Sequence, residues 1–298
     1  MQSESREPSE PSEKSCPREP FATRWRQAAH RPVGAGQVAK RLLRDAAISL
    51  ASLARPGTGA TFLRGLYCHY VFDDQVEAFD RILARLQRLG TFVDTTRLLD
   101  MLEGRAPIDG RYLHLSFDDG FRNNRTNAAP LLRRRGIPAV FFVASGMLGA
   151  SPAATRDYCR RLNYHAPIEI MTWQDAAALV REGFEIGSHT RTHARFAEIS
   201  HDPARLEEEI AGSKREIEAR LGVECRTISF PRGQPSDADA TSLATARAAG
   251  YRGCFAAYRG SIRPGVTDRF SIPRHHFEAQ WPVHHVAYFA RGHREATR

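Results

Sequence analysis

The sequence predicts an α/β fold built from parallel β/α units, and three features of its 298 residues lead to this prediction. Short runs rich in aromatic and β-branched residues, such as YLHLSF at 112–117 and AVFFVA at 139–144, have the composition of buried strands. Helical patterns of about ten or more residues alternate with these runs. Polar residues directly follow several of the runs, and in such folds the carboxyl ends of the strands line the active site.

The elements are expected in the following order along the chain. Strands are predicted at 66–71, 112–117, 139–144, 184–188, 226–230, 252–257 and 270–273. Helices are predicted at 75–89, 126–135, 172–182, 203–221 and 238–249, with Gly90 ending the first and Thr172 capping the third. Residues 145–171 show no periodicity and are expected to form a loop or a lid. Because no internal repeat is present, these elements favour a single catalytic domain over residues 60–290.

Residues 1–35 are expected to form a disordered lead, because they are polar and rich in Pro and Ser. They lack the basic start and the apolar core of a secretion signal. The five cysteines are odd in number, widely spread and without a C-x-x-C pair, so neither a disulfide framework nor a thiolate zinc site is indicated. Both observations predict a cytoplasmic protein.

Residues 36–59 are expected to form an amphipathic helix and a linker. Apolar residues recur at helical spacing, whereas the basic residues lie off this stripe, which consists of Val38, Leu42, Ala46, Leu50 and Leu53. One interpretation is a helix packed on the catalytic domain. The other is a basic amphipathic helix lying on the inner face of a membrane, which would make the protein peripheral there.

The formal net charge is +9, from 43 Lys and Arg against 34 Asp and Glu. A basic surface is able to attract nucleic acid, anionic lipid or an acidic glycan. The basic residues are scattered and do not cluster with aromatic residues, so no nucleic-acid partner is expected. The sequence contains no run of about 18 or more apolar residues, and no membrane-spanning helix is predicted.

Two motifs carry the chemistry, SFDDG at 116–120 and GSHTRTHARF at 187–196. Asp118 and Asp119 lie where a strand ends, so their carboxylates can point in different directions; the alternative is an Asp pair that caps a turn. His189 and His193 are four residues apart and share one face of a helix or tight turn; the alternative is two ordinary histidines. Because each motif ends a strand, together they predict three ligands for zinc or another first-row divalent ion and one spare base.

These motifs and ISFPRG at 228–233 resemble, in order and spacing, the polysaccharide deacetylases of the NodB-homology type, carbohydrate esterase family 4. The upstream segment at 66–93, which begins with LYCHYVFDD, resembles a subgroup that includes poly-N-acetylglucosamine deacetylases. The resemblance covers about residues 62–277. It implies a distorted (β/α) barrel and a divalent metal cofactor, most often zinc.

The resemblance also implies roles for the residues of the motifs. Asp119, His189 and His193 match the metal ligands. Asp118 matches the general base, which takes a proton from the attacking water. The backbone N–H of Arg232, which follows Pro231, matches the group that helps to hold the oxyanion.

The sequence departs from the family pattern at one position, and the general acid has more than one candidate. Ser229 stands where many members have an arginine, so Arg274 is expected to restrain Asp118 instead; the alternative is that residues 272–274 merely end a strand. His69, in the upstream segment, matches the group that protonates the departing amine. The other candidates for this general acid are His275 and His276.

These observations predict a metal-dependent hydrolase that removes an N-acetyl group from an amino sugar in a glycan or a glycolipid precursor. The expected substrate is an N-acetylated saccharide or a lipid-linked saccharide, since no export signal is seen. Two alternatives remain at this point. One is a metal-dependent C–N hydrolase acting on a small amide, and the other is a glycan-binding homologue without catalysis.

Overall fold

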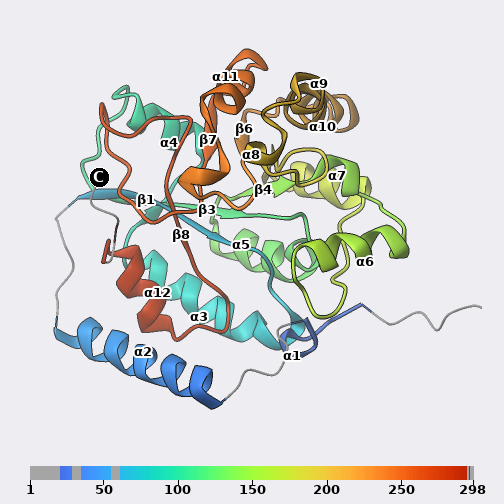
Figure 1. Cartoon of the computed structure of the whole chain (residues 1–298). Coiled ribbons are helices and arrows are strands. Elements are labelled where there is room, and N and C mark those ends of the chain that lie inside the picture. Colours follow the sequence, from blue (N-terminus) through green and yellow to red (C-terminus); the bar gives the residue numbers. More distant parts are fainter. Residues whose placement is uncertain (1–20, 29–34, 55–60, 294, 296–298) are drawn as a thin grey trace, which may run out of the picture.

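A computed structural model describes residues 21–28, 35–54, 61–293 and 295, and these form a single domain around one parallel sheet (Figure 1). The sheet has eight strands. Along it the strand order is β7-β6-β5-β4-β3-β1-β8, and β2 pairs with β3 outside this path. The strands are β1 Phe62–Cys68, β2 Thr91–Phe92, β3 Arg111–Phe117, β4 Val140–Val143, β5 Glu185–Ser188, β6 Thr227–Ser229, β7 Gly253–Phe255 and β8 Arg274–His276.

The two ends of this strand path approach each other. A parallel bridge joins Phe255 of β7 to Ile272, two residues before β8 begins. The N–H of Ala256 also donates to the carbonyl of Ile272 at 2.8 Å. The sheet is therefore a nearly closed barrel, which is the distorted (β/α) barrel that the sequence predicts.

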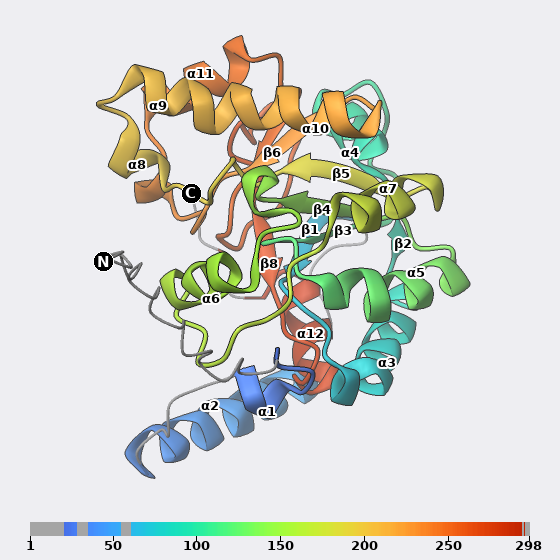
Figure 2. The ribbon, with the colours of Figure 1, turned by 90° about the vertical axis from the view of Figure 1, so that its right-hand side faces the viewer.

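Helices surround the barrel. The larger ones are α2 Ala35–Ala54, α3 Val76–Gln87, α4 Thr95–Leu102, α5 Ala129–Arg135, α6 Pro152–Arg161, α7 Trp173–Arg181, α10 Ser213–Leu221, α11 Ala240–Ala248 and α12 Val283–Ala290. Shorter ones are α1 Trp25–Ala28, α8 Phe196–Ile199 and α9 Pro203–Glu207. The helices α1 and α2 lie at one end of the molecule, and α9–α11 lie at the opposite end (Figure 1 and Figure 2).

Helix α3 shows how the sequence pattern produces this arrangement. Its residues Phe79, Ile82, Leu83 and Leu86 recur at helical spacing, and all four are fully buried. Phe79 packs edge-on against Phe117 of β3, with ring centroids 6.1 Å apart. The amphipathic stripe thus fixes the helix on the outside of the barrel, with its charged face in solvent.

The buried face of helix α2 differs from the apolar stripe that predicted this helix. Ile48 is buried against Tyr288 and Phe289 of α12, whereas Leu50 is 71% exposed and Ala46 is also exposed. The side chains of the other predicted stripe residues, Val38, Leu42 and Leu53, lie outside the described part. The aromatic surface of α12 selects the packed face, and this surface cannot be read from the helix's own periodicity.

Three further segments differ from their predictions. Helix α6 lies within residues 145–171; Thr155, Tyr158 and Cys159 are its buried residues, too few to give an apolar period. The last strand is at Arg274–His276 and not at 270–273, because Pro273 has no N–H to donate to a ladder. Helix α1 lies within the predicted disordered lead and is tied to the domain, where Ala22 donates to the carbonyl of Pro167 at 2.8 Å.

None of the helices in the described ranges combines the length and the apolar character needed to cross a bilayer.

Candidate active site

The chemistry-bearing residues meet at the carboxyl-terminal rim of the barrel. Strand β1 leads into His69, β3 into Asp118 and Asp119, and β5 into His189. Because these strands are parallel, their carboxyl ends open on the same rim. A pocket of about 350 Å³ lies there, and its walls include Tyr67, His69, Asp118, Asp119, Leu162, Asn163, Tyr164, His189, His193, Arg232, His276 and Glu278.

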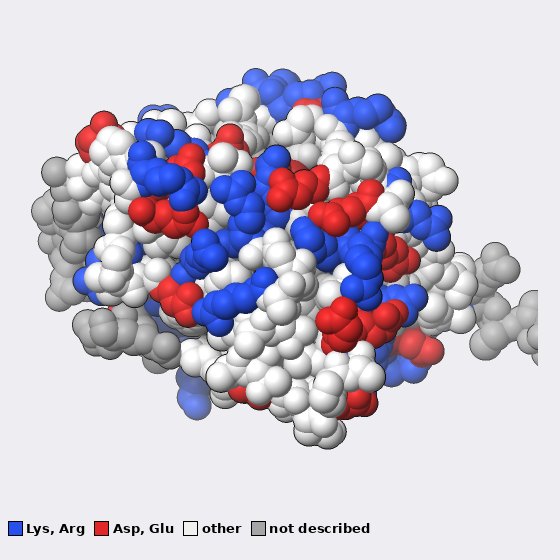
Figure 3. Space-filling model, turned by 90° about the horizontal axis from the view of Figure 1, so that it is seen from above, with Lys and Arg blue, Asp and Glu red and all other residues white. Residues whose placement is uncertain are grey.

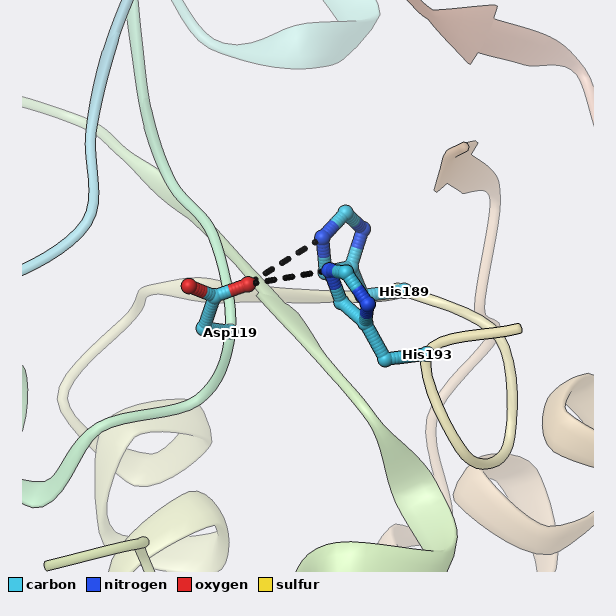
Figure 4. A group of neighbouring side chains, drawn as sticks. All are labelled: Asp119, His189 and His193. Atoms are coloured by element: carbon cyan, nitrogen blue, oxygen red, sulfur yellow. Dashed lines mark ion pairs between the residues drawn. The ribbon is translucent and has the colours of Figure 1, made fainter. Parts of the chain in front are cut away.

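Three of these side chains converge on one point (Figure 4). The Oδ1 atom of Asp119 lies 3.4 Å from Nε2 of His189 and 3.4 Å from Nε2 of His193. All three candidate ligand atoms lie within 4.8 Å of one another. Tetrahedral ligands about 2.0–2.1 Å from a zinc ion lie about 3.3 Å apart. The two separations from Asp119 to the histidines therefore fit a zinc ion or another first-row divalent ion.

The hydrogen bond made by the second ring nitrogen of His189 fits the same interpretation. Its Nδ1 donates to the backbone carbonyl of Ser229 at 2.7 Å. This bond places the proton on Nδ1 and leaves the lone pair of Nε2 directed at Asp119. Ligand histidines in metal sites are commonly oriented in this way by a carbonyl.

The electrostatics of the triad favour a bound cation. Burial alone would raise the pKa of Asp119, but the neighbouring rings of His189 and His193 lower it well below its usual value, so the carboxylate is ionised. Burial lowers the pKa of His193, which keeps that imidazole neutral. Burial also opposes a charge on His189, but Asp119 and Asp118 outweigh it and raise its pKa. The negative field that attracts a proton to His189 equally attracts a divalent cation.

The backbone around the pocket is strained. In the described part of the chain, five residues other than glycine have positive φ, namely Asp119 (71°), Asn163 (65°), Thr190 (62°), His193 (63°) and Arg232 (67°). Four of them line the pocket, and Thr190 directly follows His189. A residue with a Cβ in this conformation costs roughly 1–2 kcal/mol. Such strain persists where the surroundings enforce it, and it concentrates at functional sites.

Glu209 enforces the loop between the two histidines. Its carboxylate accepts hydrogen bonds from the backbone N–H of Arg191 (3.0 Å) and Thr192 (2.8 Å), and from Oγ1 of Thr192 (2.6 Å). Glu209 is 5% exposed and lies in a π-helical segment, Glu208–Gly212, between α9 and α10. No sequence pattern distinguishes Glu209 from Glu207 and Glu208, which directly precede it.

Asp118 lies beside the triad and is held by Arg274. The guanidinium donates from Nη1 to Oδ1 at 2.8 Å and from Nη2 to Oδ2 at 2.9 Å. Arg274 is fully buried, and it also donates to the hydroxyls of Ser116 and Ser229 and to the carbonyl of Ala256. Burial would raise the pKa of Asp118, but Arg274, His189 and His69 together outweigh burial and lower it, so Asp118 is ionised.

The three candidate histidines for the general acid occupy different places. His69 lines the pocket, and its ring lies 5.2 Å from that of His276. His276 also lines the pocket, and burial lowers its pKa to about 3, so it is neutral. His275 points to the opposite side of β8, where its Nε2 lies 3.2 Å from Oε1 of Glu295. The structure therefore brings His69 and His276 to the pocket but not His275.

Pro231 and Arg232 follow β6 at the pocket rim. Pro231 is buried, and Arg232 lines the pocket. Within the described residues the backbone N–H of Arg232 has no hydrogen-bond partner. An unpaired N–H at this rim is free to donate to a substrate oxygen.

Comparisons with known proteins identify a family and a fold. The family model described as polysaccharide deacetylase matches residues 105–254. The Bacillus subtilis (strain 168) protein YxkH, named as a polysaccharide deacetylase, is 23% identical over 167 residues, which is 51% of this chain and 52% of YxkH. The chain thus spans about half the length of this curated relative.

Solved structures share the fold. The structure of IcaB from Ammonifex degensii superposes with a TM-score of 0.64 at 23% identity, covering 78% of this chain and 98% of that chain. The Streptococcus pyogenes deacetylase PplD gives 0.62 at 16% identity, covering 78% and 99%. A de-N-acetylase from Aggregatibacter actinomycetemcomitans gives 0.56 at 18% identity, covering 76% and 99%. At these identities the likeness establishes the barrel.

Proposed function

Because the family model matches half of its length, the chain belongs to the polysaccharide deacetylase family, and we propose that it is a metal-dependent hydrolase that removes the N-acetyl group from an amino sugar. One observation carries the proposal. The triad of Asp119, His189 and His193 shares a single pocket with Asp118, a carboxylate held ionised by a buried arginine.

In this proposal Asp119, His189 and His193 hold a divalent ion, with zinc fitting the donor set best. When bound, the ion polarises the acyl carbonyl and lowers the pKa of water. Asp118 takes the proton of the attacking water on a carboxylate oxygen. Oδ2 accepts from Arg274 and from the hydroxyl of Ser229, whereas Oδ1 accepts from Arg274 and retains a further lone pair for this proton. The N–H of Arg232 donates to the oxyanion that forms as the water attacks.

His69 is the proposed general acid, which protonates the departing amine of the sugar. It lines the pocket, whereas His275 points to Glu295 on the other side of its strand. His276 is neutral because burial lowers its pKa to about 3, so it carries no proton to donate as an imidazolium near neutral pH. Its ring contacts that of His69 and supports the position of the acid.

The proposed substrate is an N-acetylated unit within a larger saccharide, free or lipid-linked. A second cleft adjoins the metal pocket and shares Leu162, His193 and Arg232 with it. A hydrolase specific for one small amide has no use for this additional space. The extended site therefore supports the saccharide over the small-amide alternative.

Helix α2 supports a peripheral membrane location as part of the proposal. Leu43 and Leu50 are seven residues apart on this helix and are 72% and 71% exposed. Lys40 and Arg44 are also exposed. Exposed leucines beside basic residues suit a surface of anionic lipid. Sedimentation of the full chain with phosphatidylglycerol vesicles tests this location, and Leu43→Ser/Leu50→Ser should reduce binding. Equal binding by this variant would contradict it.

Acetate release tests the proposed reaction. The full chain, loaded with zinc, is incubated with N-acetylglucosamine oligomers, with and without a chelator. We expect release that the chelator abolishes and that added zinc restores. Full activity after thorough removal of metal would overturn the mechanism.

Metal binding is tested separately with His193→Ala. This variant should lose the ion and the activity together, because one of three proposed ligands is missing. Zinc content measured after gel filtration gives the result, and Thr192→Ser, which keeps the neighbouring hydroxyl, is the matched control. Unchanged zinc content in His193→Ala would contradict the ligand assignment.

A further inference from the structure

A second cleft of about 550 Å³ adjoins the metal pocket. The two share Leu162, His193 and Arg232 in their walls, so they lie side by side. The lining of this cleft is Tyr158, Arg161, Leu162, Thr192, His193, Ala194, Arg195, Glu198, Ile199, Arg205, Arg232, Gln234 and Asp237.

Arginines dominate the charge of the second cleft. Arg195 is compensated, since it pairs with Asp237 and lies 3.4 Å from Glu198. Arg161, Arg205 and Arg232 form no ion pair with any residue in the described ranges. They come from the end of α6, from α9 and from the turn after β6.

Elsewhere on the surface, several arginines are paired with acidic residues. Arg135 is paired with Asp80 at 2.7 Å, Arg125 with Glu182 at 2.7 Å, and Arg215 with Glu207 at 2.9 Å. On the face shown in Figure 3, basic and acidic side chains lie interspersed in the same way. Three uncompensated guanidinium groups around one cleft repel one another, and an anionic ligand would relieve this repulsion.

We propose that the second cleft binds an anionic group, a phosphate ester or a carboxylate, on the saccharide unit next to the one that is deacetylated. The proposal rests on the proposed function for the placement of the acetamide. Planar guanidinium groups bind both kinds of anion through paired hydrogen bonds. A nucleic-acid strand fits less well, because the lining has a single aromatic residue, Tyr158, and strand binding uses a series of stacking platforms.

Calorimetry with defined probes tests this proposal on the zinc-loaded full chain. The probes are chitobiose, chitobiose carrying a phosphate ester, and a disaccharide of N-acetylglucosamine and glucuronic acid. We expect at least one anionic probe to bind roughly tenfold more tightly than chitobiose, as for hydrogen bonds to charged groups. This advantage should shrink as salt concentration rises.

Arg161→Gln/Arg205→Gln should remove the anionic advantage and leave the affinity for chitobiose unchanged. The matched control is Arg133→Gln, which removes an exposed arginine of α5 outside both clefts. The control should retain the advantage. The probe that loses affinity in the double variant identifies the cleft as a phosphate or a carboxylate site.

The results separate the two proposals. Acetate release from chitobiose oligomers together with equal affinity for all probes would overturn the anionic cleft and leave the deacetylase proposal standing. Arginine-dependent binding of an anionic probe without acetate release from any substrate would overturn the deacetylase proposal and support the cleft. An anionic advantage that persists in Arg161→Gln/Arg205→Gln would also overturn the cleft.

Discussion

The two walls of the metal pocket are built in opposite ways. On one wall, Asp118 and Arg274 extend from the ends of β3 and β8, and Arg274 is fully buried in a network of hydrogen bonds. On the other wall, His193 and Arg232 lie in loops with positive φ. The proposed base is thus held beside regular strands, and the proposed ligand His193 by a strained loop.

This difference has a physical meaning for each function. A general base must keep one orientation and one charge, which a paired guanidinium in a rigid strand provides. Metal ligands must instead converge from separate segments of chain, which requires backbone conformations that strands do not offer. The loop wall therefore needs an external restraint, and Glu209 supplies it at three hydrogen bonds.

Asp118→Asn is the strongest test of the strand wall. The amide is nearly isosteric but cannot take a proton from water, so we expect kcat to fall by roughly 10³-fold. Zinc content should stay the same, because Asp118 is not a proposed ligand. Acetate release and metal analysis check both results. Near-normal kcat would remove Asp118 as the base, and loss of zinc would show that the two walls are not independent.

His69→Gln should have the next largest effect. We expect kcat to fall by about 10²-fold with zinc content preserved, because a proton donor to the leaving amine is lost. His276→Gln is the matched control, since His276 lines the same pocket and is neutral. A greater loss of activity in His276→Gln than in His69→Gln would exchange their assignments.

Glu209→Gln tests the restraint on the loop wall. The amide of Gln has nearly the shape of the carboxylate, but an NH₂ group replaces one of its oxygens. This NH₂ group cannot accept hydrogen bonds from the N–H groups of Arg191 and Thr192. Zinc affinity should fall about tenfold, as for other residues that orient metal ligands. The neighbouring Glu208→Gln, which loses an exposed ion pair with Arg191, is the control. Equal zinc affinity in both variants would show that the strained loop keeps its conformation without the carboxylate of Glu209.

The smallest expected effect concerns how the free energy of unfolding depends on pH. His114 on β3 is buried, which lowers its pKa to about 3. The unfolded state, with a pKa of about 6.5, therefore binds this proton first as the pH falls. The stability contribution is present above pH 6.5 and is lost below it, by about 1 kcal/mol between pH 7 and pH 5.5.

Urea unfolding at both pH values measures this dependence. His114→Gln should flatten it by that amount, whereas the exposed His201→Gln should not. If the free energy of unfolding depended on pH equally in His114→Gln and in the unchanged protein, His114 would not be its source.

The sequence was informative where the signal is local. Asp118, Asp119, His189 and His193 each follow a strand-like run, and parallel strands bring such positions to one rim. The resemblance pointed to Arg274, and the structure places it on Asp118. The fold class followed from the alternation of apolar runs with helical patterns.

The features that the sequence did not reveal depend on contacts between residues that are far apart in the chain. Glu209 acts on a loop 17 residues earlier, and nothing in its own helix indicates this. The packed face of α2 is selected by aromatic residues of α12 more than 230 residues away. The pocket wall at Leu162–Tyr164 follows a helix whose sequence is too polar to show a period.

The pairing of Asp118 with Arg274 has a consequence for the order of events during synthesis. The two residues are 156 positions apart, and Arg274 lies in the last strand of the barrel. A nascent chain that has emerged only to about residue 230 contains the proposed ligands and Asp118, but not the guanidinium that lowers the pKa of Asp118. Domains acquire such distant pairings late in folding. The arginine that restrains the proposed base is therefore in place only after β8, the last strand, has been synthesised and has docked.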